Sequence, residues 1–370
     1  MRRILAIIVA FVIFPLALQA QMDMPPNGFN PRATVSEEVG ITSITIKYSR
    51  PGVKGRDGKI WGGIVANGFG AFNFLTGRPD SPWRAGANEA TTISFEHDVQ
   101  VEGKSLKAGT YALFMAIETT EVTLIFSRQT EAWGSFRYEE ADDVLRVKVK
   151  PETLNTSVEW LKYEFIDHRE DGCTVALQWE KMSVPFSIDV DVDNIVLARI
   201  REEFKGVKGF INANKIQASR YFFEKNTNLD EALSWAEQAV TGRPFGQSTF
   251  AAYENLANNY KKLNRLSEAD SIMTAGLPIA SLNEHVGYGK KLIKQNRPDR
   301  AIEVMLNAKI KFGDIYALNN VLSFAYSAKG SYKKARTYAN KALQQAPNER
   351  SKSKVGINIE KLKAGNDINQ

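Results

Sequence analysis

The sequence predicts an α+β protein in two parts, an N-terminal antiparallel β-sandwich or barrel followed by a C-terminal α-solenoid of paired helices. Up to about residue 190, apolar and polar residues alternate through short segments, as in strands with one wet face. From residue 195 onward, apolar residues recur at three- and four-residue intervals, which is typical of helices. In this second part alanines also recur every 32 to 37 residues, which indicates stacked helix pairs.

The first residues have the composition of a secretory signal. Arg2 and Arg3 precede an apolar run over 4–18, which ends in small and polar residues, and we expect cleavage after Ala20. A membrane anchor needs about 20 apolar residues, more than this run supplies. We therefore expect a signal peptide over 1–20, an extended leader over 21–32, and a periplasmic or secreted protein without a transmembrane segment.

The composition of the 370-residue chain supports at least one large core, because 43% of its residues are hydrophobic. Cys173 is the single cysteine, so no internal disulfide can form and packing must supply the stability. Residues 21–205 carry 21 basic and 28 acidic side chains, whereas residues 206–370 carry 25 and 14. Since the chain is expected to be exported, an anionic membrane face, an acidic protein or the chain's own acidic half suits the basic half better than nucleic acid does.

We expect the β-rich domain to cover 33–193. Turn signals with glycine separate its short alternating segments, and no helical pattern interrupts them. Strands are predicted over 39–48, 91–95, 99–101, 110–116, 122–126, 144–149, 158–166, 173–179 and 184–190.

A helical linker over 194–212 and repeated helix pairs over 213–363 are expected next, with a short tail over 364–370. Small residues at equivalent positions let paired helices approach closely, and stacked pairs bury a continuous core. The alanines that set the repeat are Ala232, Ala269, Ala301 and Ala335. The last unit resembles a tetratricopeptide repeat through Leu322, Tyr326, Gly330, Tyr332, Ala335, Ala342 and Pro347.

Five ordered motifs in the first half carry a second resemblance. They are SRPGVKGR (49–56), WRAGANEATTISF (83–95), GKSLKAGTYALF (103–114), WGSFRY (133–138) and DVLRVKVKP (143–151). Together they resemble the secreted Bacteroidota family called domain of unknown function 2911, over roughly 35–190. The resemblance implies an exported β-rich domain, sometimes followed by tetratricopeptide-like repeats, and it implies neither a cofactor nor a reaction.

Polar residues in these motifs form the candidate ligand site of the β-domain: Arg50, Arg56, Arg84, Asn88 and Glu89. Arginines at one end of a sandwich offer paired donors to carboxylates, phosphates or sulfates, so one interpretation of this set is a site for an anionic or sugar-like ligand. The alternative is a structural clasp in which Glu89 pairs with one of these arginines and Asn88 caps a turn. We prefer the clasp to a ligand site, and a ligand site to catalysis.

No catalytic residue, metal or cofactor is predicted. The three histidines (His97, His168 and His285) are scattered without the spacing of metal ligands. The run DVDVDN (189–194) lacks the glycine and distal glutamate of a calcium loop, and period two would place its carboxylates on one solvated strand face. An envelope hydrolase or carbohydrate-active enzyme with a site near Arg84 to Glu89 stays as the alternative function.

The segment 66–82 interrupts the family-like pattern and is expected to form a surface loop. Its aromatic residues Phe69, Phe72 and Phe74 predict either a small satellite core, which we prefer, or a platform for stacking sugars.

The function that the sequence favours is non-enzymatic binding, in which a groove of the solenoid holds a protein or peptide partner. The sequence leaves the oligomeric state open. Candidate groove residues come from the first helix of each pair: Lys215, Arg220, Asn255, Asn258, Asn259, Asn319 and Asn320.

Overall fold

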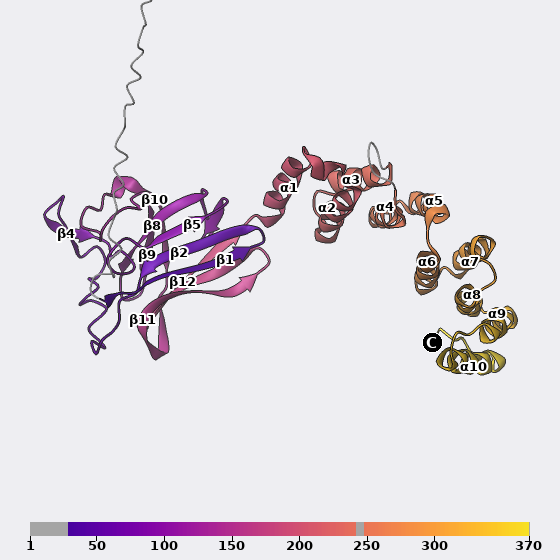
Figure 1. Cartoon of the computed structure of the whole chain (residues 1–370). Helices are drawn as coiled ribbons and strands as arrows, with labels where there is room; N and C mark the ends of the chain where they lie inside the picture. The colour runs from indigo at the N-terminus through magenta and orange to yellow at the C-terminus, as the bar shows by residue number, and fades with distance from the viewer. Residues whose placement is uncertain (1–28, 242–247, 370) are drawn as a thin grey trace, which may run out of the picture. The chain divides into compact units, whose positions relative to one another are not determined.

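The computed structural model describes residues 29–241 and 248–369. Two compact units divide the chain, residues 1–196 and 197–370, so that the boundary falls inside helix α1 (Val192–Glu203) (Figure 1). The predicted signal peptide and most of the predicted leader lie outside the described residues. Within the described ranges, no helix has the length and apolar character needed to cross a bilayer.

The first unit is built from two antiparallel sheets and a small hairpin. The larger sheet has the order β1 (Arg32–Val39), β2 (Thr42–Ser49), β5 (Thr92–Phe95), β8 (Gly109–Ile117), β9 (Val122–Ser127) and β10 (Asp143–Val149). The second sheet has the order β11 (Glu152–Arg169), β12 (Gly172–Val190), β6 (Val99–Val101) and β7 (Lys104–Leu106). The hairpin joins β3 (Ala71–Asn73) to β4 (Arg78–Ser81).

Alternation along the strands places one hydrophobic core between the two sheets. Ile46 of β2 lies opposite Ile93 of β5, and both side chains are fully buried on the inner face of the larger sheet. Phe126 of this sheet contacts Phe186 of the second sheet edge to face, with ring centroids 6.4 Å apart. The predicted β-sandwich is therefore confirmed, and its core is shared by both layers.

The strands differ from the prediction in several places. β7 is a strand where none was predicted. β1 lies partly in the predicted leader and pairs with β2 along its whole length, because its alternate residues Ala33 and Val35 pack against the core. β12 is one strand where two were predicted, since its pairing with β11 runs through the intervening residues. The segment 66–82 contains the β3–β4 hairpin rather than an irregular loop.

The second unit consists of helices in neighbouring pairs (Figure 1). After α1 and a 3₁₀ turn at Val207–Phe210, the pairs are α2 (Asn212–Lys225) with α3 (Leu229–Thr241), α4 (Phe250–Lys262) with α5 (Leu266–Gly276), α6 (Leu282–Lys294) with α7 (Pro298–Phe312), and α8 (Tyr316–Ala328) with α9 (Tyr332–Gln344). A final helix, α10 (Glu349–Lys363), packs against α9.

The alanines that set the repeat occupy one equivalent place in every pair. Ala232, Ala269, Ala301 and Ala335 are each the fourth residue of the second helix, and each is fully buried. A side chain of this size allows the two helices of a pair to approach closely, as the periodicity predicts. The predicted helical repeats are confirmed.

The segment after α10, predicted as a tail, is bound to α8. The Ser327 hydroxyl donates to the Asp367 carboxylate at 2.6 Å, and the amide of Ile368 donates to the Ser327 hydroxyl at 3.0 Å. The side chain of Ile368 is buried in the core of the helical unit. This segment therefore closes the C-terminal end of the core.

Candidate functional site

The motif WRAGANEATTISF forms a buried loop that leads into β5. Ala85 and Asn88 both adopt positive φ angles, 51° and 59°, which cost about 1–3 kcal/mol each in residues other than glycine. The Ala85 carbonyl accepts hydrogen bonds from the Tyr163 hydroxyl at 2.8 Å and from the Thr91 hydroxyl at 2.9 Å. Trp83 closes the loop by donating its indole N–H to the Gly86 carbonyl at 3.1 Å. These bonds hold the loop in its strained conformation.

Glu89 is held as an anion by Arg32, which is not among the five candidate residues. Arg32 donates to one carboxylate oxygen at 2.5 Å, and the Ser49 hydroxyl donates to the other at 3.3 Å. Burial acts to raise the pKa of Glu89, but the hydrogen bonds from Arg32, its own backbone and Ser49 outweigh it, so the pKa lies below its ordinary value. The alternation that begins at Arg32 could have signalled a strand at this position.

Arg84 lies close to Glu89 in sequence but makes no hydrogen bond to any residue in the described ranges. Its guanidinium carbon lies 5.8 Å from the ring centroid of Trp133, and its Nε atom is buried without a partner. Burial lowers the pKa of Arg84, although the nearby charge of Glu89 acts to raise it.

The other candidate arginines bind backbone carbonyls. Arg50 donates through Nε to the Leu161 carbonyl at 2.8 Å. Arg56 donates to the Val53 carbonyl at 2.8 Å and to the Gly52 carbonyl at 2.6 Å, within its own turn. These guanidinium groups fix the segment 50–56, which pairs with β11.

Asn88 is buried and is bonded within the β unit. Its side-chain oxygen accepts from the Asn30 amide at 3.4 Å, and its carbonyl accepts from the backbone N–H of Gly134 at 3.0 Å. The five candidate residues do not bond to one another through their side chains as the clasp interpretation expected. Glu89 pairs with Arg32 instead of Arg50, Arg56 or Arg84.

A hollow of about 300 Å³ opens beside Glu89 on the outer face of the larger sheet. Lys47 of β2 is exposed here and forms no ion pair within the described ranges. The hollow is lined by Arg32, Ala33, Thr34, Lys47, Tyr48, Ser49, Glu89, Ala90 and Thr92. Its two cations and single carboxylate leave a net positive charge.

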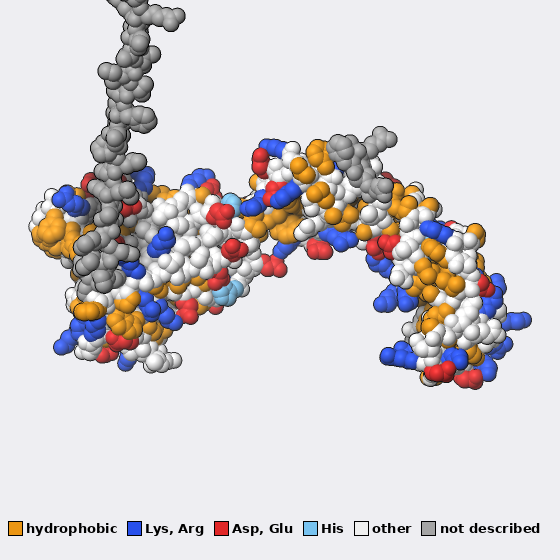
Figure 2. Space-filling view, viewed as in Figure 1, with side chains coloured by type: hydrophobic (Ala, Val, Ile, Leu, Met, Phe, Trp, Pro, Cys, Tyr) orange, Lys and Arg blue, Asp and Glu red, His pale blue; other side chains and the backbone are white. Residues whose placement is uncertain are grey.

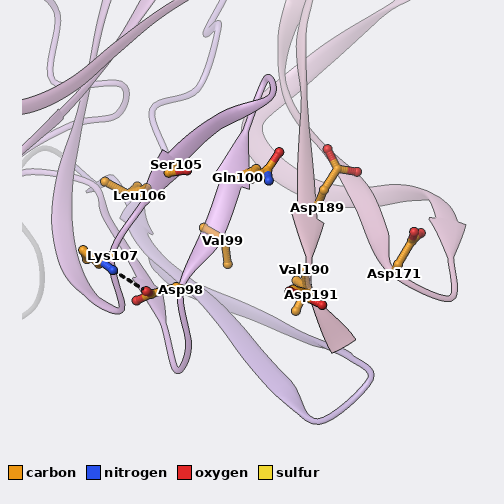
Figure 3. A pocket seen from close by; sticks show the side chains of 10 residues that line it. All are labelled: Asp98, Val99, Gln100, Ser105, Leu106, Lys107, Asp171, Asp189, Val190 and Asp191. Carbon is orange, nitrogen blue, oxygen red and sulfur yellow. Dashed lines mark hydrogen bonds and ion pairs between the residues drawn. The ribbon is translucent and has the colours of Figure 1, made fainter. Parts of the chain in front are cut away.

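A second hollow, of about 500 Å³, lies beside β6, β7 and the end of β12 (Figure 3). Four carboxylates line it, and each has a partner. Asp98 accepts from the Lys107 ammonium at 2.7 Å, as Figure 3 shows, and from the backbone N–H of Ala108. Arg169 contacts Asp189 at 2.5 Å and Asp171 at 4.0 Å, while Asp191 accepts from the Asn194 amide at 2.8 Å.

The acidic run 189–194 does not form the single strand face that period two predicted. β12 ends at Val190 and α1 begins at Val192, so Asp193 lies on the helix and Asp189 on the strand. Throughout the described part of the chain, no group of three or more histidine, cysteine or carboxylate side chains is arranged to hold a metal ion.

Most of the predicted groove residues of the helical unit are inside it. The amides of Asn255 and Asn259 both donate to the Ser219 hydroxyl, at 3.1 and 2.6 Å, and tie α4 to α2. Asn319 is fully buried and donates to the Asp314 carboxylate at 2.5 Å. Lys215 is also buried. These four residues therefore do not line a solvent-exposed groove. A polar residue type in the sequence does not show whether its side chain faces solvent or is hydrogen-bonded in the interior.

Arg220 is exposed and lines a hollow of about 570 Å³ along α2. The complete lining is Asn212, Ala213, Ile216, Gln217, Arg220, Tyr221, Glu224, Thr249 and Ala251. Asn258 is exposed and Asn320 is half-buried, and neither belongs to this lining. The hollow is not strongly basic, because its charged lining residues are Arg220 and Glu224. Residues 206–289 as a whole contain eight basic and eight acidic side chains. The positive excess of the second half lies in residues 290–370, with 17 basic and six acidic side chains.

Comparison with known proteins agrees with the resemblance of the first half. A family model described as "Protein of unknown function (DUF2911)" matches residues 30–188. No curated protein matches the chain.

Several solved structures are similar to the chain. Pseudomonas aeruginosa PilF is 19% identical, with a TM-score of 0.28 over 41% of this chain and 67% of that chain. YrrB, described as a TPR protein with an unusual peptide-binding site, is 16% identical, with a TM-score of 0.28 over 46% of this chain and 84% of that one. A thermophilic TPR protein from Thermus thermophilus is 16% identical, with a TM-score of 0.26 over 42% and 82% of the respective chains.

Proposed function

We propose that this protein is an exported, non-enzymatic binding protein whose helical unit holds a segment of a polypeptide partner along α2. The observation that carries the proposal is the hollow of about 570 Å³ on this helix. Its lining residues Ala213, Ile216, Arg220 and Glu224 are spaced by three or four positions, so they share one face of the helix. A helical or extended segment of a partner can lie along such a face.

The chemistry of this face also supports a polypeptide ligand. Arg220, Gln217 and Glu224 are exposed, and none of their side chains forms a hydrogen bond or ion pair with another described residue. Ile216 supplies an apolar contact between these polar groups. A peptide offers both the backbone and the side-chain groups that such a mixed lining can bind.

The test is site-specific photocrosslinking of this protein to its partner in living cells. A photoreactive residue at Gln217, on the hollow, should form adducts with a partner, and the same residue at Gln238, exposed on α3, should not. Arg220→Glu should remove most of the Gln217 adduct, because it reverses the charge at the centre of the lining. Equal adducts from both positions, or none from Gln217, would show that α2 is not the partner surface.

Export is proposed on the signal-like start of the chain. The mature protein should be recovered outside the cytoplasm, and N-terminal sequencing should begin at Gln21. Recovery of the full chain with Met1 in the cytoplasm would contradict this part of the proposal.

The hollow beside Glu89 favours a small anionic ligand in the β unit as a second binding function. Arg32 and Lys47 give it a positive charge, and the Thr34, Ser49 and Thr92 hydroxyls surround them. Binding of a small dicarboxylate, followed by calorimetry, should weaken in Lys47→Ala and stay unchanged in the exposed-lysine control Lys104→Ala.

A further inference from the structure

Four aromatic side chains of the β unit form a row on its surface, which we call the aromatic row: Phe72, Phe74, Phe136 and Trp133. Successive ring centroids lie 5.4, 5.1 and 6.0 Å apart. Phe72, Phe74 and Trp133 are 48%, 64% and 55% exposed, so the expected satellite core is not formed by Phe72 or Phe74. Figure 2 shows hydrophobic side chains gathered over the β3–β4 hairpin, which carries the first two rings.

The row is fixed by the backbone around it. The amide of Phe74 donates to the Phe136 carbonyl at 2.6 Å, and the side chain of Asn73 donates to the Tyr138 carbonyl at 2.9 Å. The hairpin is thereby attached to the segment 133–138. A partner would meet rings that are already ordered, so little conformational entropy would be lost on binding.

Gly134 brings the row against Arg84. A Cβ atom at this position would lie 2.9 Å from the Phe136 ring and 3.0 Å from a terminal nitrogen of Arg84, and the residue has a φ of 76°. A glycine is therefore required where the guanidinium packs beside Trp133. The guanidinium carbon of Arg84 lies over the Trp133 ring, 5.8 Å from the ring centroid, so a positive charge adjoins the row.

Exposed aromatic rings around an arginine have the composition of the centre of a protein interface. Tryptophan, tyrosine and arginine dominate binding energy at such centres, and large exposed apolar groups of this kind mark interaction sites. Loose, solvated surface aromatics would not be packed ring on ring and bonded through their backbones, as these are.

Arg84 determines the charge of the partner. Its guanidinium forms no hydrogen bond with the described residues, and Glu89, the carboxylate whose charge acts on it, is already bound by Arg32 and Ser49. A half-buried guanidinium without hydrogen bonds is costly, and a carboxylate offers it two paired acceptors. The complement of this end of the row is an acidic group.

The ring planes favour side chains over sugars as the apolar part of the ligand. Adjacent planes along the row are inclined by 77°, 47° and 27°, so the rings do not form the flat platform on which a sugar face can stack. They form an uneven apolar surface, against which branched or aromatic side chains of a partner can pack.

We infer that the aromatic row and Arg84 are a docking surface for a protein partner, and that the docked segment carries apolar side chains beside a carboxylate. The carboxylate binds Arg84, and the apolar side chains pack on Trp133, Phe136 and Phe74. This surface is separate in its residues from the hollow on α2, so the two proposals can fail independently.

The experiment uses the mature chain and an array of synthetic octapeptides. Each peptide has a central Asp or Glu flanked by Leu, Trp or Pro, and matched peptides carry Asn or Gln at the centre. We expect the acidic members to bind best. Phe74→Ala and Arg84→Gln should each weaken binding about tenfold or more, whereas Ile64→Ala, at another exposed apolar residue of the β unit, should not. Phe74 is exposed, so its variant should fold even if the Arg84 variant does not.

Three results would overturn the inference. Equal binding of acidic and amide peptides would remove the role of Arg84, and unchanged binding by Phe74→Ala would remove the role of the row. Binding that appears only in a chain beginning at residue 29 would show that the protein's own leader is the occupant. An acidic polysaccharide such as alginate, binding in place of the peptides and sensitive to Phe74→Ala, would assign the surface to glycans.

Discussion

At the scale of single residues, the loop 83–91 shows how neighbours in sequence acquire opposite environments. Glu89 is ionised and satisfied because Arg32, on a strand more than 50 residues earlier, reaches it. The guanidinium of Arg84 in the same loop forms no hydrogen bond with a residue that the structure describes. The low pKa of Glu89 makes it a poor general acid, so the rival hydrolase receives no support from this carboxylate.

Cys173 gives a prediction at this scale. Its thiol is fully buried, and burial raises the pKa of Cys173 to about 11. Because the thiolate is the reactive form, very little of it exists in the folded protein at pH 8. Iodoacetamide at pH 8 should therefore label the native protein only as fast as it unfolds, and should label it at once in denaturant. Rapid labelling of the native protein would show that this strand is open to solvent.

At the scale of elements, each helix pair depends on how closely two helices approach. Gly276 ends α5, and a Cβ atom there would lie 2.7 Å from the Cβ and ring carbon of Tyr253 on α4. Gly287, within α6, has no neighbouring atom within 4 Å of such a Cβ. Close packing of α4 against α5 therefore requires a glycine at 276, whereas the packing around α6 does not require one at 287.

Substituting both glycines tests this distinction. Gly276→Ala should destabilise the helical unit by about 1–3 kcal/mol, because Tyr253 has to move. Gly287→Ala should stabilise it by up to about 1 kcal/mol through helix propensity alone. Urea denaturation followed by circular dichroism measures both changes. A stabilising Gly276→Ala would mean that the α4–α5 contact adjusts without cost.

Asp314, between α7 and α8, links three helices and gives a pH dependence. Hydrogen bonds from Lys309, Asn319 and Lys341 hold the pKa of Asp314 far below its ordinary value of 3.8. A carboxyl whose pKa is lowered on folding stabilises the protein above its ordinary pKa, and this contribution is lost as the pH falls. The contribution should thus be complete at neutral pH and should decrease below about pH 4.

The matched variants are Asp314→Asn and Asp299→Asn, since the Asp299 carboxylate contacts only Lys329 among the described residues. Asp314→Asn should lower the Tm at pH 7, and its deficit should shrink toward pH 2.5. Asp299→Asn should change the Tm little at either pH. If the Tm difference between Asp314→Asn and the natural protein were the same at both pH values, the charge of Asp314 would not contribute to stability.

At the scale of the whole molecule, the two units have separate cores. The inner residues of the two sheets make up one cluster, and the residues of α4 to α10 make up another. A chain ending after Glu203 and a chain beginning at Val192 both contain α1. Each should unfold in a single cooperative transition, and the summed circular dichroism spectra of the two should exceed the spectrum of the full chain only by the signal of the duplicated α1. Failure of either fragment to fold would show that its core needs the other unit.

Periodicity determined the architecture, because it reports directly which side chains face a core. Period two predicted the sandwich, and the spacing of Ala232, Ala269, Ala301 and Ala335 predicted the repeated helix pairs. β1 was missed where its short alternating run adjoins a proline-rich segment. The β3–β4 hairpin was missed because its strands, with the sequences AFN and RPDS, do not alternate apolar and polar residues.

Only the tertiary structure decided which polar residues meet. The pairing of Glu89 with Arg32, the burial of Asn255, Asn259 and Asn319, and the assembly of the aromatic row all join segments distant in the chain. A polar residue in a strand or helix has the same local pattern whether water or another side chain satisfies it. Hydrogen bonds and ion pairs depend on distances between elements, which periodicity within one element does not contain.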